Sequence, residues 1–477
     1  MTGLLIAGTS SDAGKSLVVT GLARAVTRRG LRVAPFKSQN MSNNSMVCAD
    51  GSEIGRAQYL QALAAGVEPE SRHNPVLLKP GSDRRSFVVL RGRPAGQLDA
   101  GEYATGRRHL AEAAFAAFEE LADEHDLVLC EGAGSPAEIN LREGDYVNFG
   151  LAERFDLPVV LTADIDRGGA LAAIFGTHGI VTGTDRARLV GYLINKFRGD
   201  AGVLEPGLVE LSRRTGLRSL GVLPWLSEVW LDGEDALTIG SRPLHPGSGV
   251  LRVAVVHLPR TSNATDVDAL AAEPGVQVVV TTSPGEVRDA DLVVLPGSRA
   301  TVSDLAWLKA RGLAEEVVAR AEAGRPVLGI CGGYQMLTSR IHDDLESGEG
   351  EAAGLGLIPG EVCFEAEKVL GRPHGTWHDE EVTGYTIHHG RVHATAGEEF
   401  CQGRRVGATF GTMWHGAFES DGFRRAFLGE VAALTGSTWR PVPGAPGFAA
   451  RREAMIERLA DACETHLDID ALLEVAR

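Results

Sequence analysis

Residues 8–16 combine glycines, a lysine and a hydroxyl in the pattern of a phosphate-binding loop. The segment follows an apolar run of strand length and precedes a helical pattern, which is the setting that such a loop requires. Lys15 would neutralise the outer phosphates, and the Ser16 hydroxyl would bind Mg²⁺. A turn without a ligand is the alternative. The residues predicted to bind ATP here are Gly8, Thr9, Ser10, Ser11, Asp12, Ala13, Gly14, Lys15 and Ser16.

Two carboxylates are candidates to complete the Mg²⁺ site with Ser16. Glu131 follows an apolar run, and the carboxyl end of a strand faces the ligand crevice in an open α/β sheet. Asp12 lies within the loop and offers the hard oxygen ligand that Mg²⁺ prefers. Asn195 ends another apolar run, and its amide is a candidate to contact the nucleotide base. A capping carboxylate and a strand-end turn are the respective alternatives.

The second chemical centre is Cys331, which stands between an apolar run and the pair Gly332-Gly333. This is the setting of a nucleophile elbow, with a thiol in place of the usual hydroxyl. Small neighbours permit the strained turn, and the helix that begins there favours the thiolate. The other cysteines lack this setting and are predicted to be structural: Cys48, Cys130, Cys363, Cys401 and Cys463.

A thiol nucleophile needs a base and a site for the developing oxyanion. His415, far downstream of Cys331, is the predicted base. The backbone amide of Gly297 follows an apolar run, and that of Gly332 follows the nucleophile. We therefore predict that Gly297 and Gly332 form the oxyanion hole.

These residues need a scaffold, and the chain supplies two series of short apolar runs that alternate with helical patterns. Near-continuous apolar strands of this kind indicate parallel sheets that are covered on both faces. The predicted fold class is therefore α/β, with two doubly wound domains. A stretch rich in Pro, Gly and Ser separates the two series. The expected organisation is a nucleotide-binding domain at 1–240, a linker at 241–250, a second domain at 251–445 and a helical extension at 446–477.

Composition narrows the class of protein. With 47 Lys and Arg against 63 Asp and Glu, the net charge of −16 speaks against a nucleic-acid partner. No apolar run is long enough to span a membrane, and the first residues do not resemble a signal peptide. The six cysteines are scattered without CxxC pairs. We therefore expect a cytoplasmic enzyme with reduced thiols.

Several blocks of the sequence resemble the cobyric acid synthase family. The phosphate loop has the glycine spacing of dethiobiotin synthetase and its relatives, and the resemblance to cobyric acid synthases runs almost from end to end. It rests on the blocks at 35–42, 53–58, 74–80, 163–169, 384–388 and 466–468. It implies a P-loop NTPase-like domain of the dethiobiotin-synthetase type, fused to a triad-type class I glutamine amidotransferase domain.

The resemblance also implies an activity in cobalamin biosynthesis. The family uses ATP and glutamine to amidate the b, d, e and g carboxylates of adenosylcobyrinic acid a,c-diamide, which gives adenosylcobyric acid. The expected partners are therefore a corrinoid polycarboxylate, glutamine and ATP, with Mg²⁺ as cofactor. ATP would convert each carboxylate to an acyl phosphate, and Cys331 would release the ammonia that attacks it.

Basic and amide side chains are candidates to meet the corrinoid. Lys37, Gln39 and Asn40 belong to the family block at 35–42. Arg84 and Arg85 precede a short apolar run and could meet the carboxylates of the substrate. A solvated strand face is the alternative for these two arginines.

The resemblance leaves the orientation of His415 open. Many amidotransferases carry a glutamate two residues after this histidine, but Ala417 stands there and Glu419 is out of register. The sequence therefore predicts a base without a charged partner. It also predicts slow hydrolysis of glutamine until the synthetase site is occupied.

Two other functions remain open at this stage. A cobyrinic acid a,c-diamide synthase would share both chemical centres, although the block at 38–42 favours cobyric acid synthase. A ParA-like partition ATPase would share the phosphate loop. It would carry an extra lysine early in that loop, where Thr9 and Ser10 stand, and it would have no use for Cys331.

Overall fold

The computed structural model describes residues 3–81, 85–99, 107–227, 229, 249–348 and 350–476. The chain forms two compact units. Unit 1 takes the described residues of Met1–Ser42, Ser52–Asp232 and Arg452–Arg477, and unit 2 takes those of Asn43–Gly51 and Gly233–Arg451. Each unit is an α/β fold, so the predicted fold class is confirmed.

The division of the chain departs from a simple head-to-tail order in two places. The segment Asn43–Gly51 belongs to unit 2, although the chain on either side of it belongs to unit 1. Residues 452–477 return to unit 1 after unit 2 is complete. Of the expected linker, residues 241–248 lie outside the described residues.

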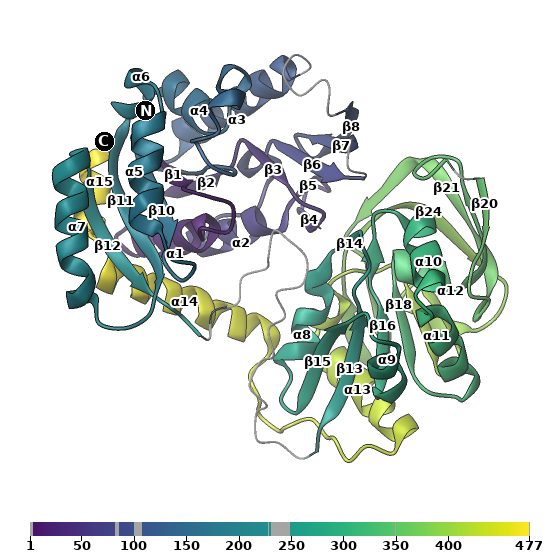
Figure 1. The fold of residues 1–477 in the computed structure, drawn as a ribbon. Helices are drawn as coiled ribbons and strands as arrows, with labels where there is room; N and C mark the ends of the chain where they lie inside the picture. The colour runs from purple at the N-terminus through teal and green to yellow at the C-terminus, as the bar shows by residue number, and fades with distance from the viewer. Residues whose placement is uncertain are drawn as a thin grey trace. The chain divides into compact units, whose positions relative to one another are not determined.

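Unit 1 is built on a six-stranded parallel sheet (Figure 1). Its strand order is β12-β11-β10-β1-β9-β2. Because β1 lies at the centre of this order, the loop after it opens at the carboxyl edge of the sheet between two neighbouring strands. The strands are β1 Gly3–Gly8, β2 Val33–Phe36, β9 Leu127–Glu131, β10 Val159–Asp164, β11 Leu189–Phe197 and β12 Arg218–Pro224.

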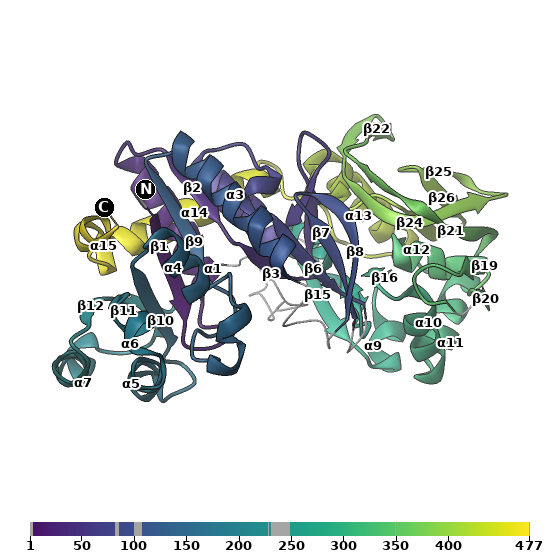
Figure 2. The same ribbon diagram turned by 90° about the horizontal axis from the view of Figure 1, so that it is seen from above.

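Helices cover both faces of this sheet. Alternate residues of β1 point to opposite sides, so Leu4 and Ile6 join one hydrophobic cluster, whereas Leu5 and Ala7 join the other. Figure 2 shows α5 and α7 on one side of the sheet and α15 on the other. The helices of unit 1 include α1 Lys15–Arg28, α2 Arg56–Ala65, α3 Arg108–Glu124, α4 Phe149–Phe155, α5 Ala170–Ile180, α7 Ala201–Thr215 and α15 Ile469–Val475, and α14 Phe448–His466 leads back into the unit.

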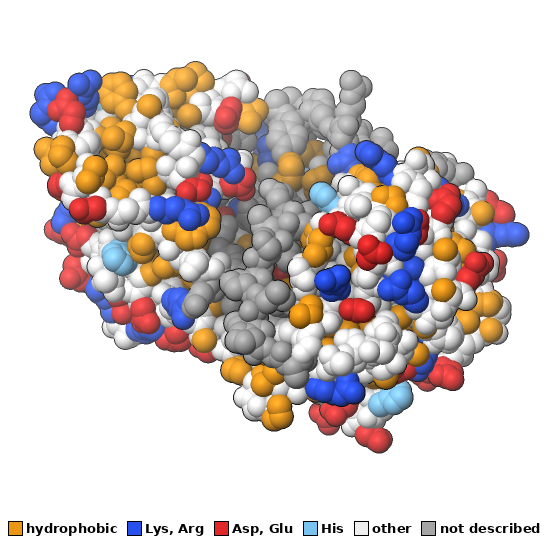
Figure 3. Space-filling model, turned by 60° about the horizontal axis from the view of Figure 1, so that its bottom comes forward, with side chains coloured by type: hydrophobic (Ala, Val, Ile, Leu, Met, Phe, Trp, Pro, Cys, Tyr) orange, Lys and Arg blue, Asp and Glu red, His pale blue; other side chains and the backbone are white. Residues whose placement is uncertain are grey.

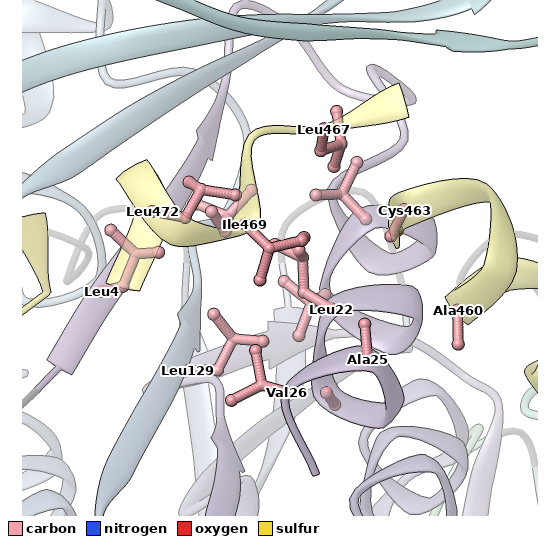
Figure 4. Close-up of a cluster of buried hydrophobic side chains, with 14 of the residues drawn as sticks. Leu4, Leu22, Ala25, Val26, Leu129, Ala460, Cys463, Leu467, Ile469 and Leu472 are labelled. Carbon is pink, nitrogen blue, oxygen red and sulfur yellow. The ribbon is translucent and has the colours of Figure 1, made fainter. Parts of the chain in front are cut away.

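The C-terminal helices complete one of these two clusters. Leu467, Ile469 and Leu472 pack with Leu4 and Leu129 of the sheet (Figure 4). Helices α1 and α14 approach closely at a glycine, since a Cβ on Gly21 would lie 2.5 Å from the Cys463 sulfur. The end of the chain is therefore part of the core of unit 1.

A second, smaller sheet in unit 1 has the order β3-β6-β7-β8. Strands β3 and β6 run parallel, whereas the other pairs are antiparallel. The sheet places residues 39–41 beside residues 76–78, so that two of the family blocks meet. Its strands are β3 Gln39–Met41, β6 Val76–Pro80, β7 Arg85–Leu90 and β8 Arg93–Asp99.

Unit 2 has a seven-stranded sheet with the order β15-β13-β16-β18-β27-β26-β25. The first five strands in this order are parallel to one another. Strand β26 runs antiparallel to β27, and β25 runs antiparallel to β26. The strands are β13 Leu251–Val256, β15 Val276–Thr281, β16 Leu292–Leu295, β18 Val327–Ile330, β25 Glu398–Phe400, β26 Gly403–Val406 and β27 Thr409–Thr412.

Helices also cover both faces of the sheet in unit 2. Figure 2 shows α13 on one side and α9, α10 and α11 on the other. An aromatic cluster on the α13 side joins Phe423 and Phe427 to Phe400 and Phe410 of the sheet. The bounds are α9 Pro284–Asp289, α10 Thr301–Ala310, α11 Leu313–Glu322, α12 Gly332–Leu337 and α13 Asp421–Thr435.

Candidate active site

The phosphate loop of unit 1 is packed against the end of β11. Gly14 has a φ of 91°, and a Cβ there would lie 1.9 Å from Asn195 Nδ2, so only glycine fits. Asn195 is buried, and its Nδ2 donates a hydrogen bond to the carbonyl oxygen of Ala13 at 3.1 Å. Its amide nitrogen is therefore engaged with the loop itself.

The side chains of Lys15 and Asp12 lie in different surroundings, one buried and the other exposed. The Lys15 ammonium is buried and donates to the carbonyl oxygens of Ser10 and Gly134, each at 3.1 Å. The Asp12 side chain is 58% exposed, and its carboxylate lies 3.5 Å from the Arg167 guanidinium. Within the described chain, Asp12 makes no ion pair with the lysine of the loop.

Glu131, the last residue of β9, lies at the centre of a buried polar cluster. Its Oε1 accepts hydrogen bonds from Ser16 Oγ and Lys37 Nζ, both at 2.9 Å. Its Oε2 accepts one from Gln61 Nε2 at 2.5 Å. The structure thus brings together two of the residues predicted to bind metal, Ser16 and Glu131. Asp12, the third, is not part of this cluster.

The charges around Glu131 keep it ionised. Burial by itself would raise the pKa of this carboxyl, because it disfavours the charged form. The charges of Lys37 and Lys15 and the hydrogen bonds from Lys37 and Gln61 more than offset burial, so the pKa lies below its usual value. A buried carboxylate is therefore available beside the phosphate loop at neutral pH.

This cluster fits a Mg²⁺ ion held together with nucleotide phosphates. Mg²⁺ binds hard oxygen ligands, and it commonly takes only one or two from the protein and the rest from phosphates and water. The Ser16 hydroxyl and the Glu131 carboxylate supply such a pair. The described residues contain no group of three or more His, Cys, Asp or Glu that could hold a metal alone. Gln61 Oε1 is buried and has no hydrogen-bond partner in the described part of the chain.

The amide candidates for the substrate are buried in a hydrogen-bonded network. Gln39 Oε1 accepts from the Tyr146 hydroxyl at 2.5 Å and from the Arg107 guanidinium. Asn40 Nδ2 donates to Gln58 Oε1 at 3.0 Å. These hydrogen bonds hold both side chains in one orientation, so neither would need to reorient to contact a substrate.

The basic candidates fall into three cases. Lys37 is buried and paired with Glu131. Arg85 begins β7, but only its backbone is described. Arg84 lies outside the described residues. The structure therefore places Lys37 beside the phosphate loop and leaves the two arginines as predictions.

In unit 2, Cys331 occupies a sharp turn between β18 and α12. It has φ 50° and ψ −107°, a conformation that is strained for a residue with a side chain. A Cβ on Gly332 would lie 2.6 Å from the Ser298 amide nitrogen, and one on Gly333 would lie 2.0 Å from the Leu295 carbonyl oxygen. Glycines therefore allow the turn to pack against the end of β16, as predicted for a nucleophile elbow.

His415 is fully buried and is held by a carboxylate that the sequence did not reveal. Its Nδ1 lies 2.6 Å from Asp266 Oδ2, and the other carboxylate oxygen accepts from the Gly416 amide at 2.8 Å. The prediction of a base without a charged partner is therefore wrong. Asp266 lies on the short helix η4 Ala264–Val267, 149 residues upstream of His415.

The surroundings of His415 favour its charged form. Burial lowers the pKa of the imidazole, but the charges of Asp266 and Cys331 and the hydrogen bond to Asp266 raise it to about 10. The Nε2 atom makes no hydrogen bond of standard geometry in the described chain. Cys331 is nevertheless close enough for its charge to raise the pKa of the imidazole.

The predicted oxyanion residues converge on the same place. A Cβ on Gly297 would lie 3.1 Å from His415 Cε1 and 2.8 Å from the Ser262 carbonyl oxygen. The Ser298 amide faces Gly332 from the neighbouring strand end. Ser298 Oγ in turn donates to Asp304 at 2.6 Å. The structure therefore gathers Gly297, Gly332, Cys331 and His415 at one site in unit 2.

Two family models match the chain. A CobQ/CobB/MinD/ParA nucleotide binding domain covers residues 4–239, and a CobB/CobQ-like glutamine amidotransferase domain covers residues 252–423. A cobyric acid synthase of Cutibacterium acnes is 63% identical over the full length of both chains. The chain belongs to the cobyric acid synthase family.

Further relatives carry the same name. A cobyric acid synthase of Mycolicibacterium vanbaalenii is 56% identical over all of this chain and 97% of its own. Among solved structures, a glutamine amidotransferase matches 39% of this chain and 98% of its own at 17% identity, with a TM-score of 0.32. As a member of the cobyric acid synthase family, the chain is a ligase with a glutamine amidotransferase domain.

On the face shown in Figure 3, acidic and basic side chains are interspersed, without a broad basic patch. Among the described helices, none combines the length and the apolar character that a membrane crossing requires.

Two residues of these centres were not found from the sequence. Gln61 follows the family block at 53–58, and two glutamines three residues apart on one helix were a weak signal. Asp266 had no signal at all, because it lies 149 residues before His415 and belongs to no motif.

Proposed function

We propose that this chain amidates the b, d, e and g carboxylates of adenosylcobyrinic acid a,c-diamide, with one ATP and one glutamine for each amide. The observation that carries the proposal is the presence, in one member of the cobyric acid synthase family, of two complete centres. One is the Glu131 cluster beside the phosphate loop, and the other joins Cys331, His415 and Asp266.

Ammonia is released in unit 2. The Cys331 thiolate attacks the carboxamide carbon of glutamine, and the amides of Gly297 and Gly332 stabilise the oxyanion. The His415 imidazolium gives its proton to the departing ammonia, which leaves a thioester. Water then attacks the thioester, His415 accepts a proton from the water, and glutamate leaves. Asp266 holds the imidazole in the orientation that both proton transfers need.

The carboxylate is activated in unit 1. A carboxylate oxygen of the corrinoid attacks the γ-phosphorus of ATP, and ADP leaves with the bridging oxygen. Ammonia then attacks the acyl carbon and loses a proton as phosphate departs with the electrons of the broken C–O bond. Catalysis of phosphoryl transfer is mainly positioning and charge neutralisation, and Lys15 and Lys37 supply both.

Ser16 and Glu131 would hold Mg²⁺ in this centre, where the metal neutralises phosphate charge as a Lewis acid. Asp12 is a second candidate ligand from the sequence, although its carboxylate faces Arg167. The side-chain nitrogen of Asn195 holds the phosphate loop. We propose that its side-chain oxygen contacts the nucleotide base. Gln39, Asn40, Arg84 and Arg85 are proposed to meet the corrinoid.

The test is mass spectrometry of the products formed from candidate corrinoids with ATP, Mg²⁺ and glutamine. Adenosylcobyrinic acid a,c-diamide should gain four amides. Cobyrinic acid without its a and c amides is the comparison substrate. Two amides added to that compound, with none added to the diamide, would overturn the proposal in favour of an a,c-diamide synthase.

A further inference from the structure

The segment Asn43–Gly51 belongs to unit 2, although the residues on either side of it in the sequence belong to unit 1. We call it the crossing segment. It directly follows the family block that contains Lys37, Gln39 and Asn40. Four of its residues are buried, namely Asn44, Ser45, Val47 and Cys48. These four residues are as buried as core residues, and the chain continues into unit 1 at both ends of the segment.

Three hydrogen bonds join the crossing segment to the start of helix η4. Asn44 Oδ1 accepts from the Ala264 amide at 3.0 Å. In return, Asn263 Oδ1 accepts from the Ser45 amide at 2.9 Å, and the Asn263 amide donates to the Asn43 carbonyl oxygen at 3.4 Å. Asn263 has a φ of 50°, which is uncommon for a residue with a side chain. The crossing segment thus fixes the turn from which η4 begins.

Helix η4 carries the partner of the catalytic base. The Asp266 amide donates to the Asn263 carbonyl oxygen at 3.1 Å, so the two residues are coupled within one turn. Asp266 then binds His415 Nδ1 and the Gly416 amide. A displacement of Asn263 is therefore transmitted to the imidazole through a single short helix.

A second contact reaches the same imidazole from another side. Val47 packs with Tyr385 and Ile387 in a small buried cluster. The Tyr385 ring stacks on that of His415 at an interplanar angle of 27°, with centroids 5.4 Å apart. Tyr385 and His415 also exchange two backbone hydrogen bonds, at 2.9 and 2.8 Å. The crossing segment therefore supports both the charged partner of His415 and the ring that stacks on it.

We propose that the crossing segment is part of the glutaminase centre and that Asn44 is a positioning residue for Asp266 and His415. The proposal rests on the function given above. Its consequence is a coupling between the two reactions. Because the segment continues the chain that carries Lys37, Gln39 and Asn40, a shift of that chain when ATP and corrinoid bind would alter the orientation of His415. The crossing segment then links the occupancy of unit 1 to the hydrolysis of glutamine in unit 2.

The test compares Asn44→Ala with Asn44→Asp in the full chain. Alanine removes the acceptor of the Ala264 amide, whereas aspartate keeps an oxygen there. For Asn44→Ala we expect kcat for glutamine hydrolysis to fall about 10- to 100-fold with little change in KM, because small misplacements of a catalytic group cost this much. Asn44→Asp should recover most of the rate. Amidation with ammonia should be unchanged in both.

Two outcomes would overturn the proposal. One is an unchanged kcat for glutamine in Asn44→Ala, and the other is an equal loss with ammonia and with glutamine. Basal glutaminase is measured without corrinoid, so it tests the positioning role even if the proposed corrinoid substrate is wrong. Failure of the wild-type chain to amidate any corrinoid with ammonia would instead count against the proposed function.

A chemical measurement covers the case in which Asn44→Ala folds poorly. Val47→Ala leaves the three hydrogen bonds intact and removes only the packing against Tyr385. In a Cys363→Ser background, the rate of Cys331 alkylation by iodoacetamide is followed against pH, with and without ATP and corrinoid. We expect the ligands to change the wild-type profile and Val47→Ala to reduce that change by at least half. A ligand response equal to that of the wild type would overturn the coupling.

Discussion

The two centres are both buried and charged, but they are built in opposite ways. In unit 1, one carboxylate, Glu131, is surrounded by donors, among them Lys37 and Ser16. In unit 2, one imidazole, His415, lies between an acidic side chain and a thiol. The first arrangement gathers positive charge for phosphates, whereas the second holds a proton at a defined atom.

This difference sets what each centre tolerates. Neutralisation of the phosphates depends on the nearby positive charges and on their distances. The phosphate centre should therefore lose activity whenever one of these charges is removed. Proton transfer depends on orientation, so the thiol centre should be sensitive to residues that never touch glutamine. Substitutions in the two units should therefore separate cleanly when the nitrogen source is varied.

The largest effect is expected for Cys331→Ala. Glutamine-dependent amidation should fall at least about 10³-fold, because removal of a nucleophile disables the whole triad. Amidation with ammonia should persist, since unit 1 is untouched. Rates are measured with each nitrogen source at saturating ATP.

Lys15→Ala is the matched variant of the other centre. It should lose amidation with both nitrogen sources and keep basal glutaminase. If Lys15→Ala and Cys331→Ala gave the same pattern, the separation of the two centres would be wrong.

Asp266→Asn should have the next largest effect. An amide keeps the shape but loses the charge that raises the pKa of His415, so that pKa should fall from its value of about 10. We expect glutaminase kcat to drop about 10²- to 10⁴-fold. The alkaline limb of the pH profile, where the imidazolium loses its proton, should move to lower pH.

Glu419→Gln is the control for Asp266→Asn, because Glu419 is the acidic residue nearest to His415 in the sequence. It should leave both the rate and the pH profile close to those of the wild type. A loss in Glu419→Gln comparable to that in Asp266→Asn would show that Asp266 is not the specific residue that orients the imidazole.

Gln61→Met should have an intermediate effect on unit 1. It removes the hydrogen bond to Glu131 Oε2 and keeps the volume, so the carboxylate loses one of the groups that fix it. We expect amidation to fall about tenfold with either nitrogen source, with an increase in the Mg²⁺ concentration that gives half-maximal rate. Basal glutaminase is the internal control and should not change.

Gln61→Glu sharpens this prediction. A second carboxylate beside Glu131 would raise the pKa of the pair, since two like charges disfavour joint ionisation. The loss should therefore exceed that of Gln61→Met and should be partly relieved at higher pH. An equal loss in both variants, without a pH response, would mean that Gln61 only fills space.

Local patterns in the sequence predicted much of this molecule. The phosphate loop, the strand that ends at Glu131 and the elbow at Cys331 each combine a short motif with an apolar run, and each lies where the pattern placed it. Such features are local, because a few adjacent residues determine both the backbone shape and the chemistry.

The features that could not be predicted from the sequence depend on contacts between distant segments. Asp266 and His415 are 149 residues apart, and nothing near Asp266 marks it as a partner. The crossing segment could not be foreseen either, because its contacts with unit 2, such as those of Asn44 and Asn263, form only in the folded chain. Pairings of this kind need either a structure or related sequences.

The smallest expected effect concerns Asp304, which supports the strand end beside Gly332. Its Oδ2 accepts from Ser298 Oγ at 2.6 Å and from the Arg260 amide at 3.2 Å. Burial is the main influence and raises the pKa of this carboxyl from 3.8 to about 6, although both hydrogen bonds act in the opposite direction. Unlike at Glu131 in unit 1, the nearby positive charge, here that of Arg260, and the hydrogen bonds do not offset burial, so the pKa of Asp304 stays raised.

The folded chain therefore binds the Asp304 proton more tightly than the unfolded chain, so its contribution to stability is present below pH 3.8 and is lost as pH rises through about 6. Asp304→Asn removes this titration and should stabilise unit 2 at pH 7.5 by roughly 1–3 kcal/mol. It should have little effect at pH 4. Urea unfolding is followed by the fluorescence of tryptophans in unit 2, including Trp307, Trp377, Trp414 and Trp439. A variant that is less stable than the wild type at pH 7.5 would show that the hydrogen bond to Ser298 outweighs the cost of the buried charge.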